Sequence, residues 1–316
     1  MTRRKFLGAT LAGGATLIAG GSNMIFAANP PAVTEADTTS LFRLGGNLPV
    51  NRLGFGAMRI TGEGIWGWPA DRANALKVLR RAVELGVNLI DTADAYGPET
   101  SELLIAEALH PYPKDLVIAT KGGLTRPGPG EWVPNGRPEY LTRCVENSLK
   151  RLQLERIDLY QLHRIDPKVP MEESLGAFKK MQEAGKIRHV GLSEVSPEEI
   201  DRARKILPIA SVQNQYNIGN RRWEKTLTYC EKEGLGFMPW SPIGGNRGLN
   251  DNALDAAARD YHASVVQLAI AWLLHRSPVM LPIPGTSSVP HLEENMAAAK
   301  LKLTAEDWKR VDAVAS

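Results

Sequence analysis

The run Asn88-Leu89-Ile90-Asp91 is short, apolar and closed by a carboxylate, and similar runs return twice further along the chain. Residues 116–121 read Leu-Val-Ile-Ala-Thr-Lys, and residues 157–163 read Ile-Asp-Leu-Tyr-Gln-Leu-His. Continuous apolar runs of this length favour strands buried on both faces, as in a parallel sheet. Parallel strands end on one face, so the pattern predicts that the carboxylate, the ammonium and the imidazole converge there.

The same alternation extends over most of the chain. Five further runs have strand character, near 53–57, 189–194, 211–216, 236–240 and 279–283. Amphipathic helical runs follow the eight strands, near 71–85, 99–109, 138–152, 172–184, 197–206, 222–233, 264–276 and 289–299. Eight strands in strict alternation with eight helices predict right-handed crossovers and a closed α/β structure, the (β/α)8 TIM barrel.

Local signals support these boundaries. Asp71, Ser196 and Ser264 are suited to cap helix starts, and Gly86 and Gly185 are suited to end them. A doubly wound sheet is the alternative fold. Its dinucleotide-binding turn requires three spaced glycines after the first strand, whereas residues 54–59 read Gly-Phe-Gly-Ala-Met-Arg.

Additional segments decorate the predicted barrel. Residues 41–50 predict an N-terminal β-hairpin around Gly-Gly-Asn, and a Pro- and Gly-rich stretch over 122–137 predicts a long loop on the active face. A helical run from Asn250 interrupts the seventh crossover, and Thr304 opens an extra C-terminal helix. We therefore expect a single barrel domain over residues 41–316.

The N-terminal residues predict a targeting segment. Residues 2–7 read Thr-Arg-Arg-Lys-Phe-Leu, a twin-arginine pattern, and the following apolar stretch over 7–21 is too short and too rich in small residues for a membrane span. We expect a signal over residues 1–28 and a polar tether over 29–40. The protein would be exported folded, to the periplasm or beyond, or remain cytoplasmic if the signal is inefficient.

Charge and cysteine content exclude some functions. The 38 Lys and Arg residues exceed the 35 Asp and Glu residues by three, and Arg3, Arg4 and Lys5 account for that excess. The remainder is balanced, so we expect no nucleic-acid partner. Cys144 and Cys230 fall in helices of different repeats, and we expect no disulfide between them.

Five separated motifs together resemble the aldo-keto reductase family over roughly residues 41–314. They are Leu-Ile-Asp-Thr-Ala-Asp-Ala-Tyr-Gly at 89–97, Ala-Thr-Lys at 119–121, the run at 157–163, Gly-Leu-Ser at 191–193 and Ile-Pro-Gly-Thr-Ser at 283–287. The loop over 125–138 and the run Trp66-Gly-Trp68-Pro69 resemble the bacterial branch that includes pyridoxal reductases.

The resemblance implies an enzyme that transfers hydride between NADPH and an aldehyde or ketone without a metal, and NADH is a possible substitute. It assigns catalysis to Asp91, Tyr96, Lys121 and His163. A phenol is a weak acid at neutral pH, and an adjacent ammonium is expected to lower its pKa. Tyr96 would then act as the general acid, with Asp91 holding Lys121 and His163 orienting the substrate oxygen.

The resemblance also implies a set of binding residues. The expected cofactor-binding residues are Ser193, Gln213, Trp240, Ser241, Pro242, Ile243, Gly285, Thr286, Ser287, His291, Glu294 and Asn295. Glu194 stands where relatives have an asparagine, and Gly285 and His291 stand where many have a Lys and an Arg. The expected substrate-binding residues are Met58, Trp66, Trp132 and Arg164.

Two other functions fit the residues. A barrel protein of this kind can act as a cofactor-binding regulatory or partner subunit with little turnover. Alternatively, Lys121 could form a Schiff base with a substrate in a lyase. Substrate identity, reaction direction and oligomeric state are left open by the sequence.

Overall fold

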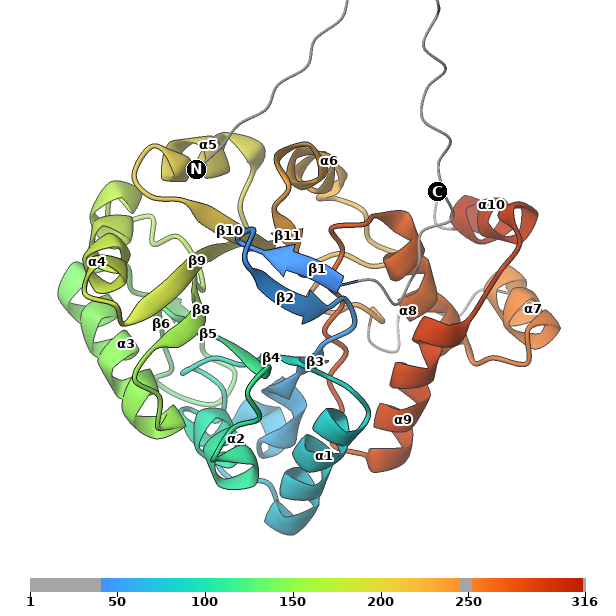
Figure 1. Cartoon of the computed structure of the whole chain (residues 1–316), viewed down its shortest axis with the longest axis horizontal. Coiled ribbons are helices and arrows are strands. Elements are labelled where there is room, and N and C mark those ends of the chain that lie inside the picture. The colour runs from blue at the N-terminus through green and yellow to red at the C-terminus, as the bar shows by residue number, and fades with distance from the viewer. Residues whose placement is uncertain (1–40, 245–251, 315–316) are drawn as a thin grey trace, which may run out of the picture. The chain divides into compact units, whose positions relative to one another are not determined.

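The computed structural model describes residues 41–244 and 252–314 of the chain. Seven parallel strands form one sheet in the order β11-β10-β9-β8-β5-β4-β3. Their bounds are Phe55–Gly56 (β3), Leu89–Asp91 (β4), Val117–Gly122 (β5), Ile157–Leu162 (β8), Ile187–Ser193 (β9), Ile209–Gln213 (β10) and Gly236–Phe237 (β11). The sheet curves around a central axis, as Figure 1 shows.

Residues 279–284 close the barrel between the two edge strands. The Phe237 N–H donates to the Val279 carbonyl and the Leu281 N–H donates to the Phe237 carbonyl, both at 2.8 Å. On the other side, the Gly54 N–H donates to the Pro282 carbonyl at 2.9 Å. The predicted eighth strand therefore lies in place, although Pro282 and Pro284 lack the N–H groups that a regular ladder requires.

Two glycines allow this closure. A Cβ atom on Gly56 would lie 2.5 Å from the Ile283 carbonyl oxygen, and one on Gly285 would lie 2.4 Å from the Gly56 carbonyl oxygen. Only glycine permits the two backbones to approach so closely.

An outer ring of eight helices surrounds the strands (Figure 1). They are Arg72–Glu84 (α1), Thr100–Leu109 (α2), Pro138–Leu152 (α3), Met171–Glu183 (α4), Pro197–Arg204 (α5), Glu224–Glu233 (α6), Val265–Arg276 (α8) and Val289–Ala297 (α9). The predicted caps form: Asp71 accepts from the Asn74 N–H at 2.8 Å, and Ser196 and Ser264 each open a capping box. The barrel fold predicted from the alternation is thus confirmed.

The predicted additions are also present. The hairpin of Leu41–Leu44 (β1) and Leu48–Asn51 (β2) packs Leu44 and Val50 against the interior of the barrel strands. Asn252–Asp260 (α7) interrupts the seventh crossover, and Ala305–Val314 (α10) follows the last unit.

The structure adds detail that the sequence did not indicate. The long loop contains a small antiparallel pair, Leu124–Thr125 (β6) with Val133–Pro134 (β7). Short 3-10 helices cover Ala57–Ile60 (η1), Glu63–Ile65 (η2) and Ala298–Lys300 (η4). Cys144 and Cys230 are both buried free thiols, as expected. Among the residues described, no helix is long and apolar enough to cross a bilayer.

Candidate active site

Three of the four predicted catalytic residues meet at the carboxyl end of the strands. Lys121 is the penultimate residue of β5, and Asp91 is the last residue of β4. The Lys121 ammonium donates to Asp91 Oδ2 at 2.6 Å, to the Thr92 carbonyl at 2.8 Å and to the Tyr96 hydroxyl at 3.3 Å. The side chain of Lys121 is completely buried, so these three acceptors replace water around its charge.

The second oxygen of Asp91 is held by two amides. Gln161 donates to Asp91 Oδ1 at 3.0 Å and Gln213 donates to the same atom at 2.8 Å. Sequence reasoning did not select Gln161, although a glutamine between Tyr160 and Leu162 in a buried strand was a usable signal. Gln213 was assigned to the cofactor, and here its amide N–H group is directed to Asp91.

Burial opposes the ionisation that we expected of the phenol. Burial raises the pKa of Tyr96, and the nearby Asp91 raises it further. These two effects together outweigh the lowering of that pKa by Lys121. The expectation of a net lowered pKa was therefore wrong for this arrangement. Burial also acts to lower the pKa of Lys121, but Asp91 and Tyr96 reverse that and leave it raised. At neutral pH the Tyr96 hydroxyl and the Lys121 ammonium are therefore both protonated.

His163 completes the group from the residue after β8. Its ring lies edge-on to Tyr96, with centroids 5.8 Å apart. Burial and the nearby cations Lys121, Arg164 and Arg126 hold the pKa of His163 well below its ordinary value. The imidazole is therefore neutral, and its Nδ1 atom is buried without a protein partner. A neutral imidazole can hydrogen-bond a substrate oxygen without competing for the proton.

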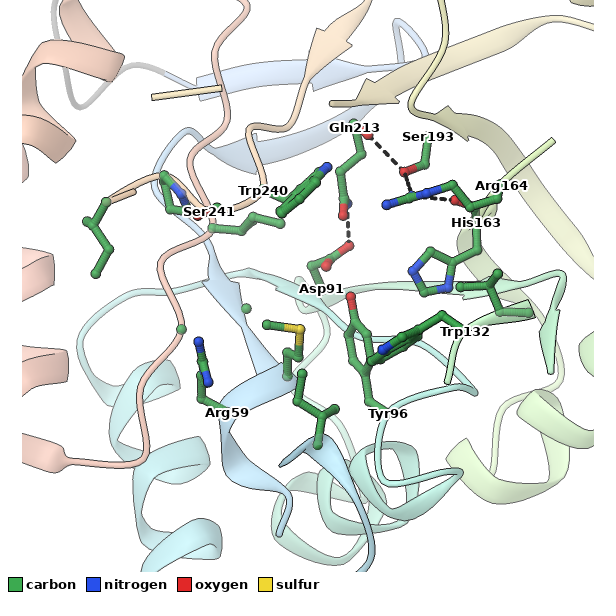
Figure 2. A pocket seen from close by; sticks show the side chains of 18 of the residues that line it. Arg59, Asp91, Tyr96, Trp132, His163, Arg164, Ser193, Gln213, Trp240 and Ser241 are labelled. Atoms are coloured by element: carbon green, nitrogen blue, oxygen red, sulfur yellow. Dashed lines mark hydrogen bonds between the residues drawn. The ribbon is translucent and has the colours of Figure 1, made fainter. Parts of the chain in front are cut away.

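A cavity of about 710 Å³ opens above these residues. Figure 2 shows Tyr96, His163 and Trp132 on one side of it and Trp240 with Ser241 on the other. Trp132 stands edge-on to Tyr96, with ring centroids 6.3 Å apart. The rest of the cavity lining is largely apolar and includes Met58, Ile65, Leu124, Pro134, Ile165, Pro242, Ile243 and Ile283. Such a cleft suits a flat, largely apolar ligand oriented by few polar groups.

Ser193 and Arg164 form the polar wall between the two halves. The Ser193 hydroxyl donates to the Gln213 carbonyl and accepts from Arg164 Nη1, each at 2.9 Å, and Arg164 Nη1 also donates to the His163 carbonyl (Figure 2). Of the predicted substrate residues, Met58, Trp132 and Arg164 line the cavity. Trp66 does not line it and lies instead near the guanidinium of Arg126, 5.4 Å from its ring centroid.

Glu194 holds the side chain of Trp240 in place. Its Oε1 atom accepts from the Trp240 indole N–H at 2.8 Å and from the Gln215 backbone N–H at 2.7 Å, and Oε2 pairs with Arg222. The carboxylate thus fixes the plane of Trp240 along the cavity. An aromatic ring held in this way offers a stacking surface of the kind a nicotinamide would use.

The predicted cofactor-binding residues from Gly285 to Asn295 lie just before α9 and within it. Ser288 caps this helix and accepts from the His291 N–H, while Thr286 Oγ1 accepts from the Ser288 N–H at 3.0 Å. Gly285 lines the cavity, whereas Thr286, Ser287, His291, Glu294 and Asn295 lie beyond its lining. Arg59 lines the same end: its Cγ would be 3.7 Å from a Cβ on Gly285. The anchored Trp240, the Gly56–Gly285 contact and this cation fit a bound nicotinamide dinucleotide.

Comparison with known proteins gives the same picture. The pattern of the Aldo/keto reductase family matches residues 52–316. An uncharacterized oxidoreductase of Schizosaccharomyces pombe is 52% identical over 268 residues, which cover 84% of this chain and 87% of that protein. Pyridoxine 4-dehydrogenase of Escherichia coli is 43% identical over 275 residues, covering 85% and 96% respectively.

A solved structure agrees in fold. An aldo-keto reductase from Klebsiella pneumoniae in complex with NADPH superposes with a TM-score of 0.73 at 26% identity, covering 87% of this chain and 94% of that one. Three findings lead to one conclusion. They are the barrel fold, the group of Asp91, Tyr96, Lys121 and His163 at its mouth, and the family match over 265 consecutive positions, residues 52–316. The chain belongs to the aldo/keto reductase family.

Proposed function

We propose that this chain reduces an aldehyde or ketone to an alcohol with hydride from NADPH, and that Tyr96 gives the proton. The reaction class follows from the family: the chain is an NAD(P)H-dependent oxidoreductase. The observation that carries the assignment of roles is the contact of 3.3 Å between Lys121 Nζ and the Tyr96 hydroxyl, at the floor of the cavity.

Each of the four catalytic residues has a different role in proton transfer. Trp240, held by Glu194, would help to hold the nicotinamide of NADPH, and the bound cofactor would supply the hydride. Tyr96 holds its proton at neutral pH, since its pKa is raised, and so it is a donor in the correct state. Lys121 stabilises the oxygen that remains after the proton leaves, and Asp91 keeps that ammonium in place. His163, held neutral, can donate one N–H hydrogen bond to the substrate carbonyl oxygen while it keeps its own proton.

The substrate class follows from the cavity and from a relative. The aromatic surface of Trp132 beside Tyr96 favours a flat ring, and Arg164 offers a cation beside the catalytic residues. A relative that is 43% identical is a pyridoxine 4-dehydrogenase. We therefore propose aromatic aldehydes such as pyridoxal as the first substrates to test.

The decisive experiment compares wild type with Tyr96→Phe. Consumption of NADPH is followed by its absorbance with pyridoxal and a panel of aromatic aldehydes. We expect the variant to lose turnover by roughly 10²- to 10⁴-fold, the usual contribution of a general acid, and to bind NADPH as wild type does. Unchanged turnover in the variant would remove Tyr96 from the mechanism.

The lyase alternative is disfavoured by the state of the lysine. Nζ of Lys121 has three hydrogen-bond acceptors, its side chain is fully buried and its pKa is raised. A Schiff base requires a free, unprotonated amine that can reach a carbonyl. Failure of borohydride to trap any substrate on the protein is therefore the expected result.

We also propose that residues 1–28 direct export by the twin-arginine route, with the polar tether of 29–40 before the barrel. These residues lie outside the described part of the chain. The support is the sequence Thr-Arg-Arg-Lys-Phe-Leu at 2–7 and the mildly apolar stretch behind it. Arg3→Lys combined with Arg4→Lys should retain the protein in the cytoplasm, and identical fractionation of both forms would refute export by this route.

A further inference from the structure

A second, smaller cavity lies beside the active site. Its volume is about 190 Å³, several times the roughly 30 Å³ share of one water molecule. Leu124 borders both cavities, and the second is separated from the first by the segment of 94–96 that carries Tyr96. The buried residues of its lining are Asp94, Ala95, Leu124 and Cys144, and the exposed ones are Glu99, Arg143 and Asn147.

Unpartnered polar atoms concentrate in this lining. Asp94 is only 8% exposed, and its Oδ1 atom is buried without a hydrogen-bond partner. Nε and Nη2 of Arg126 are also buried without partners. Thus one acceptor and two charged donors, on two residues of the same cavity, lack protein partners. Buried polar groups are normally satisfied, so such a group indicates a missing ligand or water.

The charge of the lining is positive. Arg151 is neutralised by Glu99 and the buried Glu102. Arg126 and Arg143, in contrast, form no ion pair with any of the described residues. Arg126 is held by its contact with the Ala95 carbonyl at 2.6 Å and by the Trp132 ring, 3.6 Å from its guanidinium. Two uncompensated guanidinium groups above a buried carboxyl group suit an oxyanion that also carries a proton.

We propose that this second cavity binds inorganic phosphate, held by Arg126 and Arg143 and by one proton shared with Asp94. At neutral and alkaline pH the phosphate dianion still keeps one P–OH group, which can donate to an ionised Asp94. Its remaining oxygens accept from the guanidinium groups. Sulfate has the same shape and charge but no proton, and a phosphate monoester dianion likewise has none.

The state of Asp94 decides which anions can enter. Burial raises the pKa of Asp94 to about 7, and Glu102 on α2 adds to the rise, whereas Cys144 and Arg151 on α3 oppose it. Tyr140 and Tyr160 also face this carboxyl group and are neutral, because burial raises the pKa of each. Below about pH 7 the protonated acid can donate to any oxyanion. Above it, the ionised acid repels every anion that has no proton to give.

The test is calorimetric titration of the NADPH-saturated protein, so that the phosphate-binding groups of the cofactor site are already occupied. Phosphate, sulfate and phenyl phosphate are titrated at about pH 6 and about pH 8.5. We expect phosphate to bind at both pH values. Sulfate and phenyl phosphate should weaken on the order of tenfold for each unit above the pKa of Asp94.

Three variants separate this site from general anion binding. Asp94→Asn, whose amide can donate at any pH, should abolish the pH dependence of sulfate binding and leave phosphate binding in place. Arg143→Met should weaken both anions. Lys150→Met, which removes an exposed charge of the same helix outside the cavity, is the matched control and should change neither.

The proposal does not depend on the reductase activity, since binding is measured directly. It fails if phosphate does not bind in the millimolar range. It also fails if sulfate equals phosphate at about pH 8.5, if Asp94→Asn leaves the sulfate profile unchanged, or if Arg143→Met and Lys150→Met behave alike. Preferential binding of phenyl phosphate at about pH 8.5 would assign the cavity to phosphorylated metabolites and overturn the proposal for free phosphate.

Discussion

Lys121 shows how a single buried charge organises the site. Its side chain has no exposure, and its ammonium is surrounded by a carboxylate, a carbonyl and a phenol. The carboxylate is in turn fixed by Gln161 and Gln213. The motifs in the sequence predicted the charged members of this network. The contribution of the two glutamines depends on how neighbouring strands are paired, which a single sequence does not show.

Replacing this ammonium should cost both activity and stability. Lys121→Met leaves Asp91 as a buried charge without its cation, and we expect the free energy of unfolding to fall by about 3 to 5 kcal/mol. Turnover should fall by roughly 10²- to 10⁴-fold, since the ionised phenol is no longer stabilised. Urea unfolding and NADPH consumption measure the two effects separately.

The double variant Asp91→Asn with Lys121→Met is the control for that experiment. It removes both charges and keeps the shape of the pair, so much of the lost stability should return while turnover stays low. A double variant as unstable as Lys121→Met alone would contradict the charge argument.

Asp94 should make the folded state less stable as the pH rises, whereas a carboxylate in an ion pair usually has the opposite effect. Its folded pKa of about 7 lies above the ordinary value of 3.8, so between these values the folded state holds the extra proton. The stability contributed by this group is complete below about pH 4 and is lost as the pH rises through about 7. Asp94→Asn does not titrate, and its advantage over wild type should therefore grow by about 2 to 3 kcal/mol between about pH 5 and pH 8.

Thermal unfolding in phosphate-free buffer measures this difference. Phosphate must be absent, because a ligand of the folded state would mask the effect. A constant difference between variant and wild type across that range would show that the carboxyl group titrates normally.

At the scale of elements, the sequence predicted the helices, the barrel strands and the added elements well, but not the short strand pair inside the long loop. The caps at Asp71, Ser196 and Ser264 act through local hydrogen bonds, so a local pattern suffices to find them. The β6–β7 pair within the long loop has only two residues in each strand and no repeating pattern to detect. The position of Arg126 depends on contacts with Ala95 and Trp132 that no spacing in the sequence reveals.

The last strand illustrates how a barrel can close without a regular ladder. Pro282 and Pro284 remove two donors, and the contact with β3 therefore relies on the Gly54 and Gly56 N–H groups and on close approach of the backbones. A methyl group on Gly56 would have to push the Ile283 carbonyl away. We predict that Gly56→Ala lowers the free energy of unfolding by about 1 to 3 kcal/mol.

Gly176→Ala in α4 is the matched comparison. A Cβ there meets nothing within 4 Å, so the better helix propensity of alanine should raise stability by about 0.5 to 1 kcal/mol. Denaturant midpoints of the two variants should thus move in opposite directions. A loss of stability in Gly176→Ala equal to that in Gly56→Ala would mean that close approach at the closure is not the cause.

For the whole molecule, the central question is how the first and last units of the barrel are held together. Arg52 precedes β3 and is 2% exposed, yet its side chain contacts the last units of the barrel. Its guanidinium donates to the carbonyls of Leu274 and Ser277 at the end of α8 and to that of Met280 in the closing strand. One side chain therefore satisfies carbonyl groups that would otherwise be left where α8 ends, more than 220 residues away.

Arg52→Met should separate the stability of this closure from that of the rest of the barrel. Three buried carbonyl groups lose a charged donor, and each costs about 1 to 3 kcal/mol when it is left unsatisfied. We expect hydrogen exchange to accelerate in α8 and residues 279–284, while amides of β5 and β8 stay protected by their ladder. Arg80→Met, which removes one exposed bond to the Ala108 carbonyl, should leave exchange unchanged. Uniform acceleration over all strands in Arg52→Met would instead show that the closure and the central strands unfold as one unit.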